Sequence, residues 1–176
     1  MVEYSDIKKY KRIYVTGAPG VGKTTFAERL SESLGIPYFR LDDLAHSSDF
    51  SKRFSDTEKK EGLEKLLKKS SWIIEGVHDT WMEPLYQSAE LVLNLDPPKL
   101  LSLYRVYKRS RDLIKQGTTH TYKDMAYLLK KALKYDSEKR PETLSRIESY
   151  GLPSISLRRK KEVDNLLDYL NEGIKS

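Results

Sequence analysis

The residues with the clearest chemical potential lie near the start of the chain, in the run GAPGVGKT at residues 17–24. Its pattern is G-x-x-x-x-G-K-[ST], in which glycines let successive backbone N–H groups turn toward one anion. An apolar run precedes it and an amphipathic helix is predicted to follow, so the helix N-terminus would add partial positive charge. This context predicts a loop that holds the phosphates of a nucleoside triphosphate.

The residues of this loop have distinct expected roles. Lys23, a candidate catalytic residue, would bridge the β- and γ-phosphates as a point charge. The Thr24 hydroxyl would ligate magnesium, and Thr25 is expected at the α-phosphate. We therefore expect ATP and Mg²⁺ as cofactors, bound by Gly17, Ala18, Pro19, Gly20, Val21, Gly22, Lys23, Thr24 and Thr25.

The elements that must position this loop alternate between short apolar runs and longer, helix-like segments. Strands are expected at residues 13–16, 37–41, 71–75, 91–95 and 153–157. Helices are expected at about 22–34, up to about 69 after the polar stretch 47–60, from 99 onward, through most of 112–150, and at about 160–170. Because parallel strands need helical crossovers, this alternation predicts a doubly wound α/β fold in one domain over residues 1–176.

Composition limits the kind of protein. The 176 residues include 32 Lys and Arg against 26 Asp and Glu, a formal net charge of +6. A mildly basic surface suits nucleotides or nucleic acid and does not choose between them. The absence of cysteine excludes disulfides, thiol nucleophiles and cysteine-ligated zinc. No apolar run approaches the roughly 20 residues that span a bilayer, and no signal-peptide pattern is present. We therefore expect a soluble, cytoplasmic protein without a membrane partner.

Beyond the loop, the chain resembles the adenylate-kinase-like P-loop kinases, and more closely the DNA topology modulation or adenylate kinase-related proteins. The matching stretches are TGAPGVGKTTFAERLSESLGIPYFRLDDL at 16–44, WIIEGV at 72–77, LVLNLDPPKLLSLYRVYKR at 91–109 and PSISLRRKKEVDNLLDYL at 153–170. The resemblance implies a P-loop NTPase three-layer sandwich, with a five-stranded parallel sheet in order 2-3-1-4-5 and helices on both faces. It also implies a short lid at about residues 108–122, for which Gly117 is the expected hinge.

Two acidic residues at strand ends gain roles from this resemblance. In the implied order Glu75 ends a strand beside the first, so its carboxylate would lie near Thr24 and hold magnesium through water. A carboxylate that faces solvent is the alternative. Asp42 follows the second strand, where open α/β sheets bind ligands, and would orient the acceptor or take its proton. The alternative for Asp42 is a cap on the next helix.

Two arginines after the fourth strand are the remaining candidates. The resemblance implies that Arg105 and Arg109 clamp the phosphates, because charge develops on the oxygens of the transferring group. Their i, i+4 spacing lets them share one helix face, although a solvated cationic face would look the same.

Together these features predict a kinase that transfers the γ-phosphoryl group of ATP to a nucleotide or nucleoside-like acceptor. The expected partners are ATP and this small molecule. Two alternatives stay open, a nucleotide-regulated DNA-binding protein and a simple ATPase with water as acceptor. The acceptor itself is not identified, because residues 45–70 and 110–150 match the family least.

Overall fold

A five-stranded parallel sheet lies at the centre of the protein, in a computed structural model that describes residues 3–45, 54–77 and 81–172. The strand order is β2-β3-β1-β4-β5, which confirms the predicted order. The strands are β1 (Arg12–Gly17), β2 (Tyr38–Arg40), β3 (Trp72–Glu75), β4 (Leu91–Leu95) and β5 (Ser154–Leu157). β3 and β4 are buried along their whole length, as expected for strands covered on both faces.

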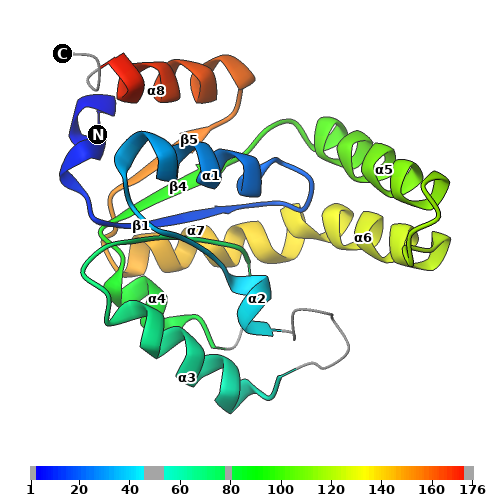
Figure 1. Ribbon diagram of the computed structural model, residues 1–176, viewed down its shortest axis with the longest axis horizontal. Helices are drawn as coiled ribbons and strands as arrows, with labels where there is room; N and C mark the ends of the chain where they lie inside the picture. The colour runs from blue at the N-terminus through cyan, green and yellow to red at the C-terminus, as the bar shows by residue number, and fades with distance from the viewer. Residues whose placement is uncertain (1–2, 46–53, 78–80, 173–176) are drawn as a thin grey trace.

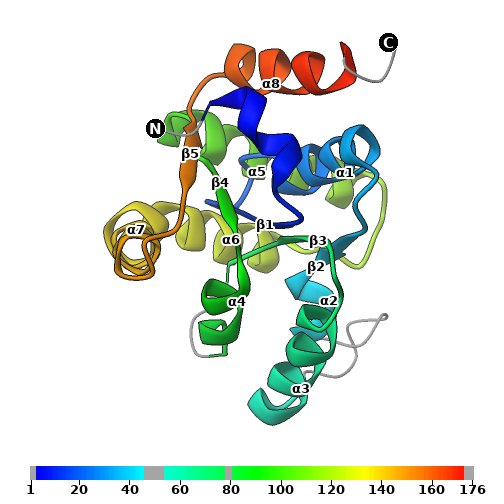
Figure 2. The same cartoon turned by 90° about the vertical axis from the view of Figure 1, so that its left-hand side faces the viewer.

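Helices lie on both faces of the sheet (Figure 1 and Figure 2). Side chains of β1 alternate between two apolar layers, one on each face. Ile13 and Val15 point to one layer, and Tyr14 points to the other. The first layer is completed by helices η1 (Tyr4–Lys9, a 3₁₀ helix), α1 (Lys23–Leu34) and α8 (Lys160–Glu172). The second layer is completed by α3 (Asp56–Leu67), α4 (Glu83–Ser88) and α7 (Arg140–Ser149). The sheet therefore has helices on both faces, as predicted.

The register of the sheet brings three strand ends to one edge. Val15 lies opposite Glu75 of β3, and Gly17 lies opposite Leu95 of β4. The residues that follow β1, β3 and β4 therefore leave the sheet together, at the edge where open α/β sheets bind their ligands.

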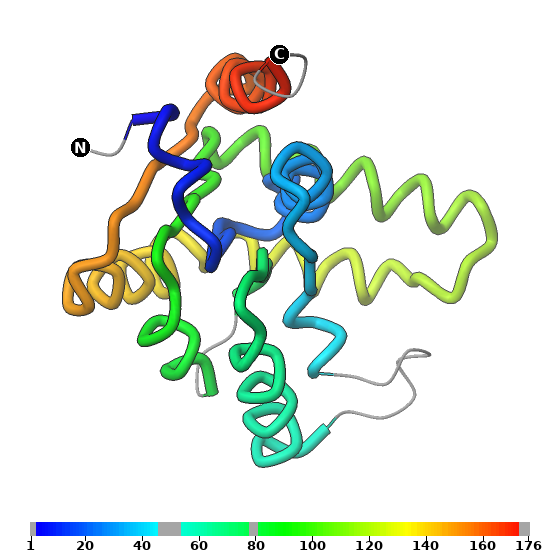
Figure 3. The backbone as a smooth tube through the Cα atoms, turned by 60° about the vertical axis from the view of Figure 1, so that its left-hand side comes forward, coloured from blue at the N-terminus to red at the C-terminus, as the bar shows by residue number. Residues whose placement is uncertain are grey.

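Two helices extend beyond the sheet as an arm (Figure 1 and Figure 3). α5 (Lys99–Lys115) and α6 (Tyr122–Lys134) pack against each other, and the π-helix η2 (Tyr135–Lys139) joins α6 to α7. The chain that returns from the arm is fastened to the sheet by a bidentate ion pair, in which Arg140 of α7 donates from Nε and one terminal nitrogen to the two Asp96 oxygens over 3.0 and 2.6 Å. Asp96 directly follows β4, so this pair holds α7 at the carboxyl edge of the sheet.

The structure corrects several expected element boundaries. β2 ends at Arg40, and the next residues form the short helix α2 (Leu41–Ala45) rather than the end of a strand. The segment expected to form a lid, about residues 108–122, comprises the last turns of α5, the connection 116–121 and the first residue of α6, and its role as a lid stays a prediction. The predicted lid segment is therefore the tip of the arm. Part of the polar stretch 47–60 lies outside the described residues.

Besides α2, two further helices in the described part of the chain were not predicted, the 3₁₀ helix η1 and the short helix α4. Both have too few residues to show a helical period in the sequence. No helix in the described ranges is long and apolar enough to cross a membrane.

Gly76, directly after β3, has a backbone conformation that side chains rarely adopt. Its φ is +141°, and a Cβ placed there would lie 2.8 Å from Leu41 Cβ. Tyr14 OH also donates to the Gly76 carbonyl over 3.0 Å, which fixes the peptide. The close approach of α2 to the end of β3 therefore depends on glycine.

We predict that Gly76→Ala lowers the free energy of unfolding by about 3 kcal/mol, because strain and a steric clash combine. Gly35→Ala is the matched control: Gly35 ends α1 at φ +65°, but an added Cβ meets no atom within 4 Å. Its cost should be about 1 kcal/mol. Urea unfolding measures both, and equal losses would mean that the contact with Leu41 does not constrain this turn.

Candidate active site

The glycine-rich loop lies between β1 and α1, pressed against β4 and α5. A Cβ on Gly17 would lie 2.3 Å from the Leu95 carbonyl oxygen, and one on Gly20 would lie 2.6 Å from Val106 Cγ2. Gly17, Gly20 and Gly22 all have positive φ, at 140°, 79° and 98°. The loop is thus a strand–loop–helix turn that only glycine can build at its two close contacts.

Lys23 is folded back over this loop. Its Nζ donates to the carbonyl oxygens of Gly17 and Ala18 over 2.9 and 3.0 Å. Burial lowers the pKa of Lys23, and the negative charges of Glu75 and Asp42 partly offset that effect. The ammonium group is therefore partly shielded from solvent, with two carboxylates within electrostatic reach.

Glu75 brings together three neighbouring groups. It is buried, with 4% of its surface exposed. Thr24 Oγ1 donates to Glu75 Oε1 over 3.0 Å, and Tyr38 OH donates to the same oxygen over 3.3 Å. Arg40 Nε lies 3.8 Å from it as an ion pair. Glu75 thus points inward, toward Thr24, and not toward solvent.

Hard oxygen donors make this corner suitable for magnesium. Mg²⁺ in phosphoryl-transfer sites is usually bound by one or two carboxylates together with substrate phosphates and water. The Thr24 hydroxyl and the Glu75 carboxylate supply such a donor pair next to the phosphate loop. The described residues contain no cluster of three or more His, Cys, Asp or Glu side chains that could hold a metal alone. The residues therefore fit a metal that is held largely by the nucleotide.

The structure puts Asp42 in a different backbone setting from the expected one. Asp42 and Asp43 lie in the first turn of α2, exposed, rather than at the end of a strand. Asp42 is the second residue of that helix, so it does not occupy the capping position before it. Its negative charge nevertheless acts to raise the pKa of Lys23, against the larger effect of burial.

The two candidate arginines of α5 have different surroundings. Arg105 is half-buried, and one of its terminal nitrogens donates to the Val21 carbonyl over 2.9 Å. Arg109, one turn later, is exposed to solvent. The structure thus brings Arg105 to the phosphate loop, whereas Arg109 lies farther along the arm.

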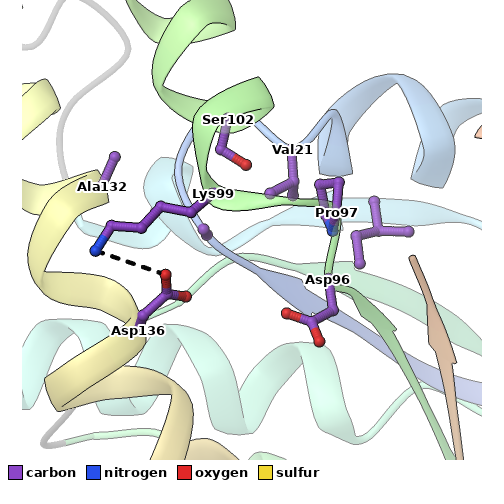
Figure 4. A pocket seen from close by; sticks show the side chains of 9 residues that line it. Val21, Asp96, Pro97, Lys99, Ser102, Ala132 and Asp136 are labelled. Carbon is purple, nitrogen blue, oxygen red and sulfur yellow. Dashed lines mark ion pairs between the residues drawn. The ribbon is translucent and has the colours of Figure 1, made fainter. Parts of the chain in front are cut away.

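A small hollow lies between the loop and the base of the arm (Figure 4). Ala18 and Val21 of the loop line it, and Lys99 crosses it to form an ion pair with Asp136 of η2 at 3.8 Å. Its lining does not include Lys23, Thr24 or Glu75. It therefore lies beside the loop, separate from the corner that contains Lys23, Thr24 and Glu75.

Two neighbours of Glu75 were not predicted from the sequence. Tyr38 and Arg40 come from β2, which pairs with β3 so that Arg40 lies opposite Glu75. Arg40 Nε is buried and has no hydrogen-bond partner among the described residues. Arg40 could have been predicted at this site from the sequence, because it stands two residues before Asp42 at the end of an expected strand. The partner of Asp96, Arg140, carried no such signal because it is 44 positions away.

A family model described as an AAA domain (AAA_18) matches residues 13–125, more than half of the chain, including the phosphate loop, Glu75 and α5. The chain belongs to this family. Its members share the P-loop nucleotide-binding fold, which agrees with the predicted resemblance.

Curated relatives point in the same direction. A "Putative adenylate kinase" of Saccharolobus islandicus is 32% identical over 92 residues, which are 47% of each chain. A second one, of Pyrococcus furiosus, is 58% identical over 33 residues, 19% of this chain and 18% of that protein. The matches to these kinases thus span at most about half of their length. The uncharacterized protein YqaC of Bacillus subtilis is 26% identical over 93% of this chain and 99% of its own length.

Solved structures share the fold over nearly the full chain. Shikimate kinase from Acinetobacter baumannii, in complex with shikimate, superposes with a TM-score of 0.57 over 98% of both chains. A gluconokinase from Sinorhizobium meliloti superposes with a TM-score of 0.55 over 94% of this chain and 95% of its own. Each is 17% identical in sequence, so the likeness concerns the P-loop kinase-like fold.

Proposed function

We propose that this protein is a phosphotransferase that moves the γ-phosphoryl group of ATP to a nucleotide or nucleoside-like acceptor. The observation that carries the proposal is the contact between Thr24 and the buried Glu75 carboxylate, directly beside the phosphate loop and its lysine. Relatives named as adenylate kinases and a kinase-like fold support the same class of reaction.

The donor side consists of the loop amides and Lys23. A phosphate oxygen is a stronger partner for an ammonium than a neutral carbonyl is. Lys23 would therefore leave Gly17 and Ala18 for the β- and γ-phosphates when ATP binds. Thr24 and Glu75 would hold Mg²⁺, which neutralises charge on the β- and γ-oxygens when bound.

The acceptor side would lie at the ends of β2 and β3. Arg40 has a buried N–H without a hydrogen-bond partner in the described part of the chain, and its charge is shared with Glu75 and Asp43 at 3.8 and 4.0 Å. Such a group favours an acceptor with a negative charge, which a nucleotide has and a neutral polyol lacks. Asp42, on α2 next to it, would orient the attacking hydroxyl and accept its proton.

The arm would complete the charge balance. Arg105 already touches the loop through Val21, so a small change in its side chain would direct it at a phosphate. Arg109, exposed one turn farther, would need the arm to move toward the loop. Both would stabilise the charge that develops on the transferring group. This division makes Arg105 a binding contact and Arg109 a contact of the closed state.

The function is tested by ATP consumption with magnesium in the presence of nucleoside monophosphates, nucleosides or polyols. We expect at least one monophosphate or nucleoside to raise the rate about 10-fold or more over water alone, with a phosphorylated product that mass spectrometry identifies. Lys23→Ala should abolish both ATP binding and turnover. ADP release at one rate with every acceptor would instead identify an ATPase.

A second prediction concerns Glu75→Gln, which keeps an oxygen to accept from Thr24 and removes the charge. We expect the Mg²⁺ concentration for half-maximal rate to rise about 10-fold, because a neutral amide is a weaker ligand for a hard cation. ATP affinity measured in EDTA should change by less than about twofold. An unaltered Mg²⁺ requirement would show that Glu75 does not serve the metal.

A third prediction separates the acceptor from the donor. Arg40→Gln should raise the acceptor KM by about 10–100-fold, the equivalent of one lost charged hydrogen bond, and leave the KM for ATP nearly unchanged. Arg40→Lys keeps the charge but loses the guanidinium fork, so its acceptor KM should lie between that of the unchanged protein and that of Arg40→Gln. Equal increases for both substrates would contradict an acceptor role.

A further inference from the structure

One side of α5 carries an aromatic and basic stripe that the proposed phosphotransfer does not use. We define the α5 stripe by residues at steps of three or four, which place them on one side of a helix: Leu100, Tyr104, Tyr107, Lys108, Arg111 and Lys115. Leu100 is 81% exposed, Tyr104 59% and Tyr107 44%. Arg105, which contacts the phosphate loop, is on another side of the helix.

Positive charge is concentrated on the arm that includes this stripe. Residues 99–134 contain ten Lys and Arg and two acidic residues, whereas the whole chain has a net charge of only +6. The remainder of the protein is therefore slightly acidic. The positive excess of the chain is therefore carried by these two helices, and such a concentration of charge attracts anions.

Exposed aromatic rings are concentrated on the same two helices. Nine large hydrophobic side chains are exposed among the described residues, and seven of them belong to α5 or α6. Four of these seven are tyrosines: Tyr104, Tyr107, Tyr122 and Tyr127. Exposed aromatic rings do not increase solubility, and a group of them often marks a binding surface. The four tyrosines on this basic surface therefore point to a ligand with flat faces.

Cations and rings are also interleaved at close range. The Arg111 guanidinium lies 5.9 Å from the centre of the Tyr107 ring, and Lys131 Nζ lies 5.2 Å from the Tyr127 ring. Single-stranded nucleic acid presents what such a surface matches, with phosphates for the cations and base faces for the rings. A membrane would favour a continuous apolar face, which the Lys and Arg residues interrupt here.

We propose that the α5 stripe binds single-stranded nucleic acid without sequence preference. From Leu100 to Lys115 the helix rises about 22 Å, a length that would accommodate a few nucleotides. Tyr104 and Tyr107 stack with bases, and Lys108 and Arg111 pair with the backbone phosphates between them. This binding is independent of the proposed phosphotransfer, because it uses other side chains of the arm.

Fluorescence anisotropy with labelled 20-nucleotide oligo(dT) and oligo(rU) tests the proposal on the full chain. We expect the variant with Tyr104→Ala and Tyr107→Ala to lose about 10-fold or more in affinity for both probes, because stacked bases each contribute strongly. Replacing the same residues by Phe should change the affinity by less than about twofold, since the rings stay. ATP affinity should be the same in all of these variants.

Matched controls separate this surface from general charge. Tyr169→Ala removes an exposed tyrosine of α8 that also has a lysine, Lys8, over its ring at 5.7 Å. It should leave oligonucleotide affinity unchanged. Lys108→Gln with Arg111→Gln should flatten the salt dependence of binding by about 1.4 in the log–log slope, two phosphates at about 0.7 each. The control variant on α8, Lys160→Gln with Lys161→Gln, should leave the salt dependence of oligonucleotide binding unchanged.

Three results would overturn the proposal. Polyglutamate competing as well as the oligonucleotide would show that only charge is recognised. Binding to phosphatidylserine vesicles without binding to either oligonucleotide would assign the stripe to a membrane surface. Equal loss in the Ala and Phe variants would exclude stacking. Thermal unfolding of every variant checks that the fold is retained, so that a loss reports the surface itself.

Discussion

A carboxylate buried at the end of β3 is the constraint around which this edge of the sheet is arranged. Removing a charge from water is costly unless hydrogen bonds or opposite charges compensate it. Glu75 obtains its compensation from three side chains of two elements: Thr24 of α1, and Tyr38 and Arg40 of β2. The strand order makes this possible, because β3 lies between β1 and β2. Compensation of the buried Glu75 charge therefore links the phosphate loop, through Thr24, to β2, through Tyr38 and Arg40.

A second compensated carboxylate, Asp96 at the end of β4, holds α7, the helix that follows the arm. Arg140 approaches it with both ends of its guanidinium fork, and Arg158 lies 3.5 Å away. Two strand ends, those of β3 and β4, thus each have an acidic residue that recruits arginine. One organises the corner beside the loop, and the other fixes the helix that returns from the arm.

Much of this arrangement was accessible from the sequence. Glycine spacing after a short apolar run predicted the loop, and the alternation of strand and helix patterns predicted the parallel sheet. The position of Glu75 beside Thr24 followed once the strand order was assumed. α2 was missed because it has only five residues, and the contacts of Arg40 and Arg140 were missed because they depend on side chains brought together from distant parts of the chain. The functional roles of these residues stay predictions that kinetics must test.

The contact of Gly17 with the Leu95 carbonyl has a consequence for how the protein is made. The eight-residue motif is complete after residue 24, yet the carbonyl on which it rests is supplied 71 residues later. During synthesis, a nascent chain that ends before β4 contains all residues of the motif but lacks the Leu95 carbonyl against which Gly17 packs. Because β1 pairs with β3 and β4 rather than with β2, its neighbours also arrive late. The nucleotide-binding shape is thus complete only after β4 has been synthesised, although the motif itself is translated 71 residues earlier.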